Sequence, residues 1–292
     1  MDNLKAKGII LAATGVFIIS FDALLVRIAY TNVWNIIFWR GIFMGISLTA
    51  FLIFRDGFNR LLDFRNNWFK TLLSSAIFVV SGAGFVLSVE NTTVANTVVI
   101  LSMAPLFAAL FTRIFLGEPV KSKTWIAMIV SLIGVIIIFQ DSLGSLNLKG
   151  DIIAVITAAS MGLNLTFLRK NPELKRTPIV CISGFMLGFA FLPLAAPFEM
   201  GVNSYIVLGI MGLFQMPMAM IFMASATRYI TSPEASMFQL IESVLGPVWV
   251  WLAIGEKPSE ATFIGGAIIL LTLFIHSYTE LKRRKSKQNT LQ

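Results

Sequence analysis

Charged side chains inside long apolar runs are the residues of this sequence most able to do chemistry. Glu242 is the strongest case, because it stands near the middle of an apolar run from 233 to 254. An ionised carboxylate at such a depth costs on the order of 3 kcal/mol, so it should face a wet cavity or a partner. This carboxylate could bind the positive group of a substrate, or it could take up and release a proton during transport.

Polar side chains recur around Glu242 at helical spacing. Ser236 and Gln239 precede it, and Ser243 and Gly246 follow on the same predicted face. A polar stripe on an otherwise apolar helix predicts the wall of a cavity. The alternative is a set of interhelical hydrogen bonds that only fixes packing.

Asp22 and Arg40 are the other charged candidates. Asp22 and its sequence counterpart Asn164 occupy equivalent depths in two apolar runs, which favours a shared site, although a polar pair that joins two helices is equally consistent. Arg40 could anchor a substrate carboxylate. We favour a salt bridge to an acidic side chain or an interfacial position, because Gly41 and Gly45 indicate a tight packing face.

Further polar residues are predicted to line the same site. Gln215 precedes Pro217 in a methionine-rich run, which would form an adaptable wall, although such runs are more often simply core or lipid-facing. The lesser lining candidates are Ser81, Asn96 and Ser102.

The composition predicts the setting of these residues. Of the 292 residues, 57% are hydrophobic and only 13% are charged, and the mean hydropathy is +0.82. These values indicate a polytopic membrane protein without a large extramembrane domain. Cys181 is the only cysteine, so no internal disulfide or cysteine-based metal site is possible, and no cofactor is predicted. The net charge is +8, and most of the basic residues lie in short loops and in the tail. A membrane protein explains this distribution better than a nucleic-acid-binding protein does.

Ten apolar runs are long enough to span a bilayer, which needs roughly 20 mostly apolar residues. The first run contains Asp22 and lacks a convincing cleavage site, so we interpret it as a span and not as a signal peptide. The predicted spans are 8–28, 33–54, 69–89, 94–116, 123–140, 149–168, 178–198, 204–227, 233–254 and 260–279.

The basic residues predict the orientation of these spans. With the N-terminus inside the cell, the inner segments hold 18 of the 23 Lys and Arg residues. The outer segments hold only Lys149 and Lys257, and the remaining three lie within apolar runs. This asymmetry places both termini in the cytoplasm, in what we expect to be a bacterial inner membrane.

The sequence repeats itself weakly along its length. Lys7-Gly8, Asp22 and Arg27 are echoed at Lys149-Gly150, Asn164 and Arg169, each 142 residues later. The echo also includes Gly41 and Gly45 with Gly184 and Gly188, and Gly117-Glu118 with Gly255-Glu256. Since each half holds five spans, an odd number, the halves are inverted. We predict an all-α membrane protein of two inverted five-helix repeats, 1–143 and 144–280, with a basic cytoplasmic tail at 281–292.

Several short motifs are similar to those of the drug/metabolite transporter superfamily, in its ten-helix EamA-type branch. They are Ser20-Phe21-Asp22-Ala23, Trp39-Arg40-Gly41, Ala104-Pro105-Leu106-Phe107, Leu116-Gly117-Glu118, Ile241-Glu242-Ser243, Ile254-Gly255-Glu256 and Gly265-Gly266. The resemblance covers about residues 7–279. It departs from the family at Asp22, where Asn is usual, at Ser183 opposite Arg40, and at Pro247, which follows Glu242 later than the family proline.

The resemblance implies a secondary transporter for a small organic metabolite, working by alternating access and favouring export. An amino acid or a related zwitterionic or cationic compound is the substrate class we expect. The expected partners are that small molecule, the lipid bilayer and either protons or a counter-substrate, with no nucleic acid. The alternatives are a polytopic membrane enzyme, which one His and scattered carboxylates argue against, and a receptor or assembly protein without transport activity.

Overall fold

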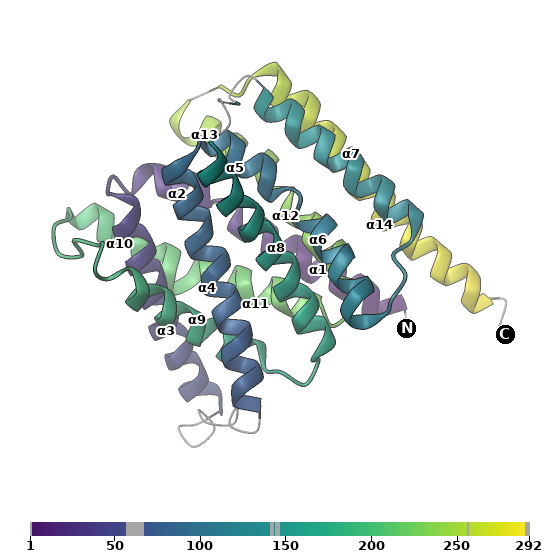
Figure 1. Ribbon diagram of the computed structural model, residues 1–292, viewed down its shortest axis with the longest axis horizontal. Helices are drawn as coiled ribbons and strands as arrows, with labels where there is room; N and C mark the ends of the chain where they lie inside the picture. Colours follow the sequence, from purple (N-terminus) through teal and green to yellow (C-terminus); the bar gives the residue numbers. More distant parts are fainter. Residues whose placement is uncertain (1, 57–66, 141–142, 144–146, 256, 290–292) are drawn as a thin grey trace.

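The fold is a bundle of helices, seen here in a computed structural model (Figure 1). The structure describes residues 2–56, 67–140, 143, 147–255 and 257–289, and throughout this part of the chain the regular secondary structure is helical. The predicted connector Gly144-Ser145 and the residue Glu256 lie outside the described residues.

The helices follow the predicted spans closely. Nine described helical stretches are long and apolar enough to cross a membrane, and α9 is a tenth, shorter apolar helix. The helices are α1 (Asp2–Ile19), α2 (Asp22–Ile28), α3 (Val33–Asp56), α4 (Trp68–Asn91), α5 (Val94–Leu101), α6 (Ala104–Phe111), η3 (Thr112–Leu116), α7 (Ser122–Phe139), α8 (Leu148–Lys170), α9 (Arg176–Phe191), α10 (Val202–Ile210), η5 (Met211–Gln215), α11 (Met216–Ala226), α12 (Ser232–Gln239), α13 (Glu242–Ile254) and α14 (Glu260–Asn289).

Two predicted spans differ in length from the observed helices. The span predicted at 178–198 ends at Phe191, since Pro193 and Pro197 cannot continue a helix and the chain turns there. The span predicted at 260–279 instead continues as helix to Asn289.

Three spans that we predicted as continuous helices are broken, which corrects the prediction. The breaks fall at Ser20-Phe21, between α1 and α2, at Ser102-Met103, between α5 and α6, and at Leu240-Ile241, between α12 and α13. Pro105 explains the second, because its ring removes the bond to the carbonyl four residues earlier. The third occurs without a proline at the equivalent position, where the chain has a serine.

The echoed glycines meet each other across the two halves. Helix α3 packs against α9, and a Cβ added at Gly41 would lie 2.7 Å from the carbonyl oxygen of Gly184 and 2.6 Å from the backbone nitrogen of Gly188. A Cβ at Gly184 would in turn lie 2.9 Å from the Gly41 oxygen. Only glycine permits this approach of two backbones, so corresponding residues of the repeats form one tight contact.

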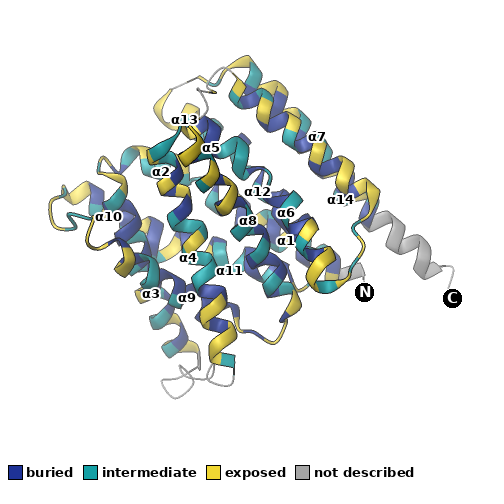
Figure 2. Cartoon of the chain, viewed as in Figure 1, coloured by how far each residue is buried: buried dark blue, intermediate teal, exposed yellow. Residues whose placement is uncertain are grey.

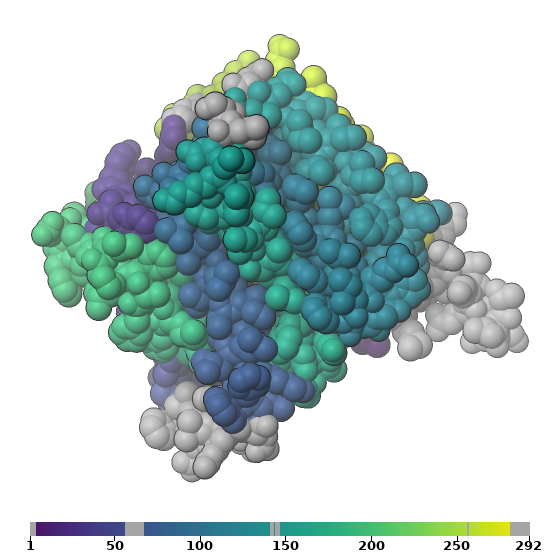
Figure 3. Space-filling view, viewed as in Figure 1, coloured from purple at the N-terminus to yellow at the C-terminus, as the bar shows by residue number. Residues whose placement is uncertain are grey.

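A second pair of echoed glycines packs in equivalent surroundings. A Cβ at Gly8, in α1, would lie 2.6 Å from Tyr229 Cβ, just beyond α11. A Cβ at Gly150, in α8, would lie 2.6 Å from the carbonyl carbon of Asn91, the last residue of α4. In each half, therefore, the first span packs against the third span of the other half: α1 against α11, and α8 against α4. Figure 3 shows α4 and α8 side by side across one face of the molecule.

The outer surface of the bundle is largely apolar. Helices α7 and α14 lie together along one edge, and exposed positions on them alternate with buried ones (Figure 2). Ile126, Ile129 and Ile133 of α7 and Leu271 and Phe274 of α14 are each about half exposed or more. Such a surface suits the hydrocarbon of a bilayer, where backbone groups must be satisfied within the protein.

The glycine contact predicts a sharp difference between two alanine substitutions. We expect Gly41→Ala to lower the thermal unfolding temperature in detergent, because overpacking of this kind typically costs about 1–3 kcal/mol. Gly209→Ala is the matched control, since it is also helical but a Cβ there meets nothing within 4 Å. It should be neutral or slightly stabilising, and equal effects of the two variants would contradict the close packing.

Candidate functional site

Asp22 and Arg40 form an ion pair at the break in the first span. Asp22 is the first residue of α2, and its Oδ2 lies 3.2 Å from Nη1 of Arg40 on α3. The two side chains are 18% and 21% exposed, and Oδ1 of Asp22 has no hydrogen-bond partner within the described residues. Of the alternatives considered for Arg40, the structure therefore contains the salt bridge to an acidic side chain.

Glu242 completes a group of three charges. It is the first residue of α13, just after the break at Leu240-Ile241, and it lies within electrostatic range of both Asp22 and Arg40. Helix α13 packs against α2, which brings the two broken spans together. The group therefore holds two carboxylates and one guanidinium. The sequence analysis named all three residues as candidates for one site, but it did not predict that Asp22 would be the acidic partner of Arg40.

Aromatic side chains surround the break in the first span. Trp249 Nε1 donates to Ser20 Oγ at 2.8 Å, and its ring stacks on Phe21 with centroids 4.5 Å apart. Phe17 meets both rings edge to face. The sequence interpretation missed this cluster. The available signals were the position of Phe21 directly before Asp22 and of Trp249 seven residues after Glu242, a spacing that places two residues on one helical face.

Gln215 supports the backbone at the same break. Its Nε2 donates to the carbonyl oxygens of Ile18 and Ile19, both at 3.3 Å, at the end of α1 where helical carbonyls lack partners. Its Oε1 is buried and has no partner among the described residues. Gln215 was predicted to bind substrate, and the structure gives its amide nitrogen a role in holding α1.

A second carbonyl near this site is satisfied in a similar way. Pro217 has no backbone N–H, so it cannot bond the carbonyl of Leu213 four residues earlier. The hydroxyl of Ser47 on α3 donates to that oxygen at 2.6 Å instead. The carbonyl freed by Pro217 is therefore used within the protein.

The remaining candidates make local or interhelical contacts away from the three charges. Ser74 Oγ donates to Asn164 Oδ1 at 2.8 Å between α4 and α8, so Asn164 and Asp22 have different partners. Asn96 donates its side-chain amide to Thr92, and its backbone N–H is capped by Thr93. Ser81 and Ser102 each donate to a carbonyl of their own helix, those of Ile77 and Val99.

Ser236 and Gln239 occupy the last two turns of α12, before the break. Ser236 is fully buried, and neither its Oγ nor the Oε1 of Gln239 has a hydrogen-bond partner in the described part of the chain. Buried polar atoms are nearly always hydrogen-bonded, so such atoms need an explanation. Together with Asp22 Oδ1 and Gln215 Oε1, they are buried oxygens for which the described residues supply no hydrogen-bond donor.

A pattern for one transporter family matches almost the entire chain. The EamA-like transporter family matches residues 6–140 and 148–278. The chain belongs to this family. It is therefore an integral, multi-pass membrane protein of the drug/metabolite transporter type, and a transporter of a small molecule, as the sequence resemblance predicted.

Individual relatives agree with this assignment. The uncharacterized transporter YdfC of Bacillus subtilis (strain 168) is 25% identical over 207 residues, covering 66% of this chain and 68% of that protein. An uncharacterized transporter of Clostridium kluyveri is 28% identical over 214 residues, covering 69% of each chain. A riboflavin transporter of Rhizobium johnstonii is 24% identical over 195 residues, covering 65% of this chain and 64% of that protein.

A solved crystal structure of another protein has the same fold. It aligns with a TM-score of 0.81 and 15% identity, covering 93% of this chain and 98% of its own. At this level of identity the likeness concerns the fold alone.

The ion pair predicts a double-mutant result. Asp22→Asn and Arg40→Gln should each lower the free energy of unfolding in detergent by about 1–3 kcal/mol, because each leaves a partly buried charge without its partner. The double variant should lose less than the sum of the two single losses, since no charge is then left unpaired. Strictly additive losses would show that the two side chains do not interact.

Proposed function

We propose that this protein is a secondary active transporter that moves a small zwitterionic or cationic metabolite across the membrane by alternating access, in the direction of export. The observation that carries the proposal is the group of Asp22, Arg40 and Glu242 at the breaks of two spans. These are charged, partly exposed side chains in the interior of an apolar bundle. Charged side chains in this position are energetically costly, and they usually mark a functional site.

The charges of this group favour a positive or zwitterionic ligand. Asp22 and Arg40 form an ion pair, which leaves Glu242 as the additional acidic side chain of the group. An ammonium group of the substrate would bind Glu242. A substrate carboxylate would bind Arg40 in competition with Asp22, so that an amino acid would exchange one ion pair for another. An anionic substrate without an ammonium group would meet two acidic side chains and only one basic one.

The surroundings of the charges supply an apolar contact surface. Phe17, Phe21 and Trp249 form an aromatic cluster beside Asp22. Aromatic faces attract organic cations and also pack against apolar side chains. A substrate with a charged head group and an apolar part would contact both kinds of surface.

The arrangement of the two halves supports alternating access. Corresponding glycines of the repeats meet between α3 and α9, so a contact shared by both halves lies close to Arg40. Inverted repeats provide two arrangements of similar energy, each open to one side, around a site near the midplane. The direction of export is part of the proposal and rests only on the resemblance to the ten-helix EamA-type branch.

The energy source is proposed to be an ion or substrate gradient. The sequence contains no G-x-x-x-x-G-K-[ST] motif, and its loops are too short to form an ATPase domain. Protons and a counter-substrate are the two candidates for the coupled species, and Glu242 is the side chain that would take part in either exchange.

Counterflow in vesicles tests the role of Glu242. Vesicles that contain the purified protein and are loaded with unlabelled substrate should take up the labelled compound faster than vesicles without the protein. Glu242→Gln should abolish coupled transport while leaving expression intact. Glu199→Gln is the matched control, since Glu199 is an exposed carboxylate in the connector between α9 and α10. Normal transport with unchanged pH dependence in Glu242→Gln would remove this residue from the mechanism.

A ligand panel tests the substrate class. The thermal unfolding temperature in detergent should rise when amino acids, polyamines or quaternary amines are added, because a ligand that binds only the folded state stabilises that state. Dicarboxylates serve as the negatively charged comparison, and riboflavin is included because one relative carries that name. Stabilisation by the anions alone would overturn the proposed substrate class, and no exchange of any compound in vesicles would overturn transport itself.

A further inference from the structure

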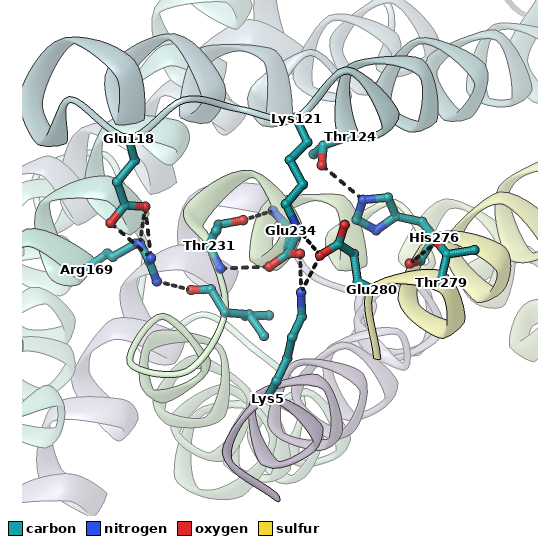
Figure 4. Close-up of polar contacts among 11 residues, drawn as sticks. Lys5, Glu118, Lys121, Thr124, Arg169, Thr231, Glu234, His276, Thr279 and Glu280 are labelled. Atoms are coloured by element: carbon teal, nitrogen blue, oxygen red, sulfur yellow. Dashed lines mark hydrogen bonds and ion pairs between the residues drawn. The ribbon is translucent and has the colours of Figure 1, made fainter. Parts of the chain in front are cut away.

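A second cluster of charged side chains has four members, three of which are buried. Lys5 Nζ lies 2.7 Å from Glu234 Oε1 and 3.3 Å from Glu280 Oε2, and Lys121 also contacts Glu280 (Figure 4). The side chains of Lys5, Glu234 and Glu280 are only 4%, 9% and 3% exposed, whereas Lys121 is 46% exposed. We call these four residues the ion cluster.

The ion cluster joins segments from both halves of the chain. Lys5 belongs to the first turns of α1, and Lys121 lies just before α7, both in the first repeat. Glu234 is in the first turn of α12, and Glu280 is on α14, both in the second. The cluster therefore ties the two repeats together at the end of the bundle where the N-terminus lies, which the basic residues predict to be cytoplasmic.

The first turn of α12 holds one member of the cluster rigidly in place. Thr231 accepts from the backbone N–H of Glu234, and Glu234 Oε2 accepts from the backbone N–H of Thr231, which is a capping box. One oxygen of Glu234 thus fixes the helix end while the other binds Lys5.

The corresponding end of the other repeat has the same cap but not the charge. Thr93 caps Asn96 at the start of α5 just as Thr231 caps Glu234 at the start of α12, 138 residues later. By the same sequence correspondence, Lys5 matches Asn147 and Lys121 matches Ser259. Three of the four charges therefore have neutral counterparts at the opposite end of the bundle.

A neighbouring ion pair differs from the cluster in this respect. Arg169 donates to Glu118 and to the carbonyl oxygen of Ile230 at the same end of the bundle (Figure 4). Its residues do have charged counterparts in the sequence echo, Arg27 and Glu256. The asymmetry between the two ends therefore belongs to the ion cluster.

We propose that Lys5, Glu234, Lys121 and Glu280 form a gate that holds the cytoplasmic end closed, and that the neutral residues at the corresponding positions of the opposite end make the outward-facing state the resting state. The inference rests on the proposed alternating access. Opening toward the cytoplasm must separate Lys5 of one repeat from Glu234 and Glu280 of the other, and breaking a buried pair is costly. Substrate or ion binding must supply that difference, since a ligand shifts such an equilibrium only by its unequal affinity for the two states.

Two reporter cysteines test this gate in a Cys181→Ser background, which removes the only native cysteine. Met237→Cys lies beneath the cluster, because Met237 is 1% exposed and lines the same small cavity as Lys5 and Glu234. Ala23→Cys lies beside Asp22 at an exposed position. A membrane-impermeant maleimide is applied from the cytoplasmic side for the first reporter and from the opposite side for the second.

Lys5→Met should change the two reporters in opposite directions. Labelling of Met237→Cys should become roughly tenfold faster, and labelling of Ala23→Cys should slow, because the population moves from the outward-facing to the inward-facing state. Lys70→Met is the matched control: Lys70 also pairs with an acidic residue of the other half, Glu173, but both side chains are exposed, at 47% and 44%. It should leave both rates unchanged.

A second variant keeps the test decisive if Lys5→Met does not fold. Glu234→Gln should produce the same opposite changes. Faster labelling of both reporters together would indicate general loosening and would overturn the gate, as would no change at either position. The readout needs no transport, so the two proposals fail separately. Opposite changes in the two labelling rates without any counterflow would contradict the transport function alone. Counterflow with unchanged labelling rates would contradict the gate alone.

Discussion

Polar groups inside the apolar bundle must find their partners within the protein, and much of the local structure follows from this requirement. Each break in a span frees backbone groups from the hydrogen bonds of a continuous helix. At the first break, Gln215 donates to two carbonyls of α1, and Ser47 donates to the carbonyl that Pro217 leaves free. The side chains that satisfy the backbone come from neighbouring spans, so the broken helices also fix how these spans pack.

The two repeats share a scaffold and differ in their charges. The corresponding glycines of α3 and α9 meet in one contact, whereas each of the three central charges has a neutral counterpart: Asn164 for Asp22, Ser183 for Arg40 and Ala104 for Glu242. All three counterparts are buried, at 4%, 2% and 2% exposed. Packing therefore follows the symmetry of the repeats, and the charged site and the ion cluster depart from it.

The sequence predicted the spans and a tight packing face at Gly41 and Gly45, but not the partner of that face, the breaks or the ion cluster. Apolar length and glycine spacing are local signals, which is why the ten spans and the packing role of Gly41 could be predicted. Lys5 and Glu280 are 275 positions apart, and the pattern around each is that of an ordinary helix end. Their meeting depends on how the two halves pack. The break before Glu242 lacks the proline that would have marked it, so tertiary packing must impose it.

The two acids stand at breaks that relate differently to the repeat of the chain. Asp22 and Glu242 are each the first residue of the half-helix that follows a break. The break before Glu242 has a counterpart at Ser102-Met103, where the equivalent residue is the neutral Ala104. The counterpart of Asp22, by contrast, is Asn164, which is neutral and stands in α8, a helix that runs unbroken from Leu148 to Lys170. At Asp22, therefore, both the break and the charge depart from the symmetry of the repeats, whereas at Glu242 only the charge does.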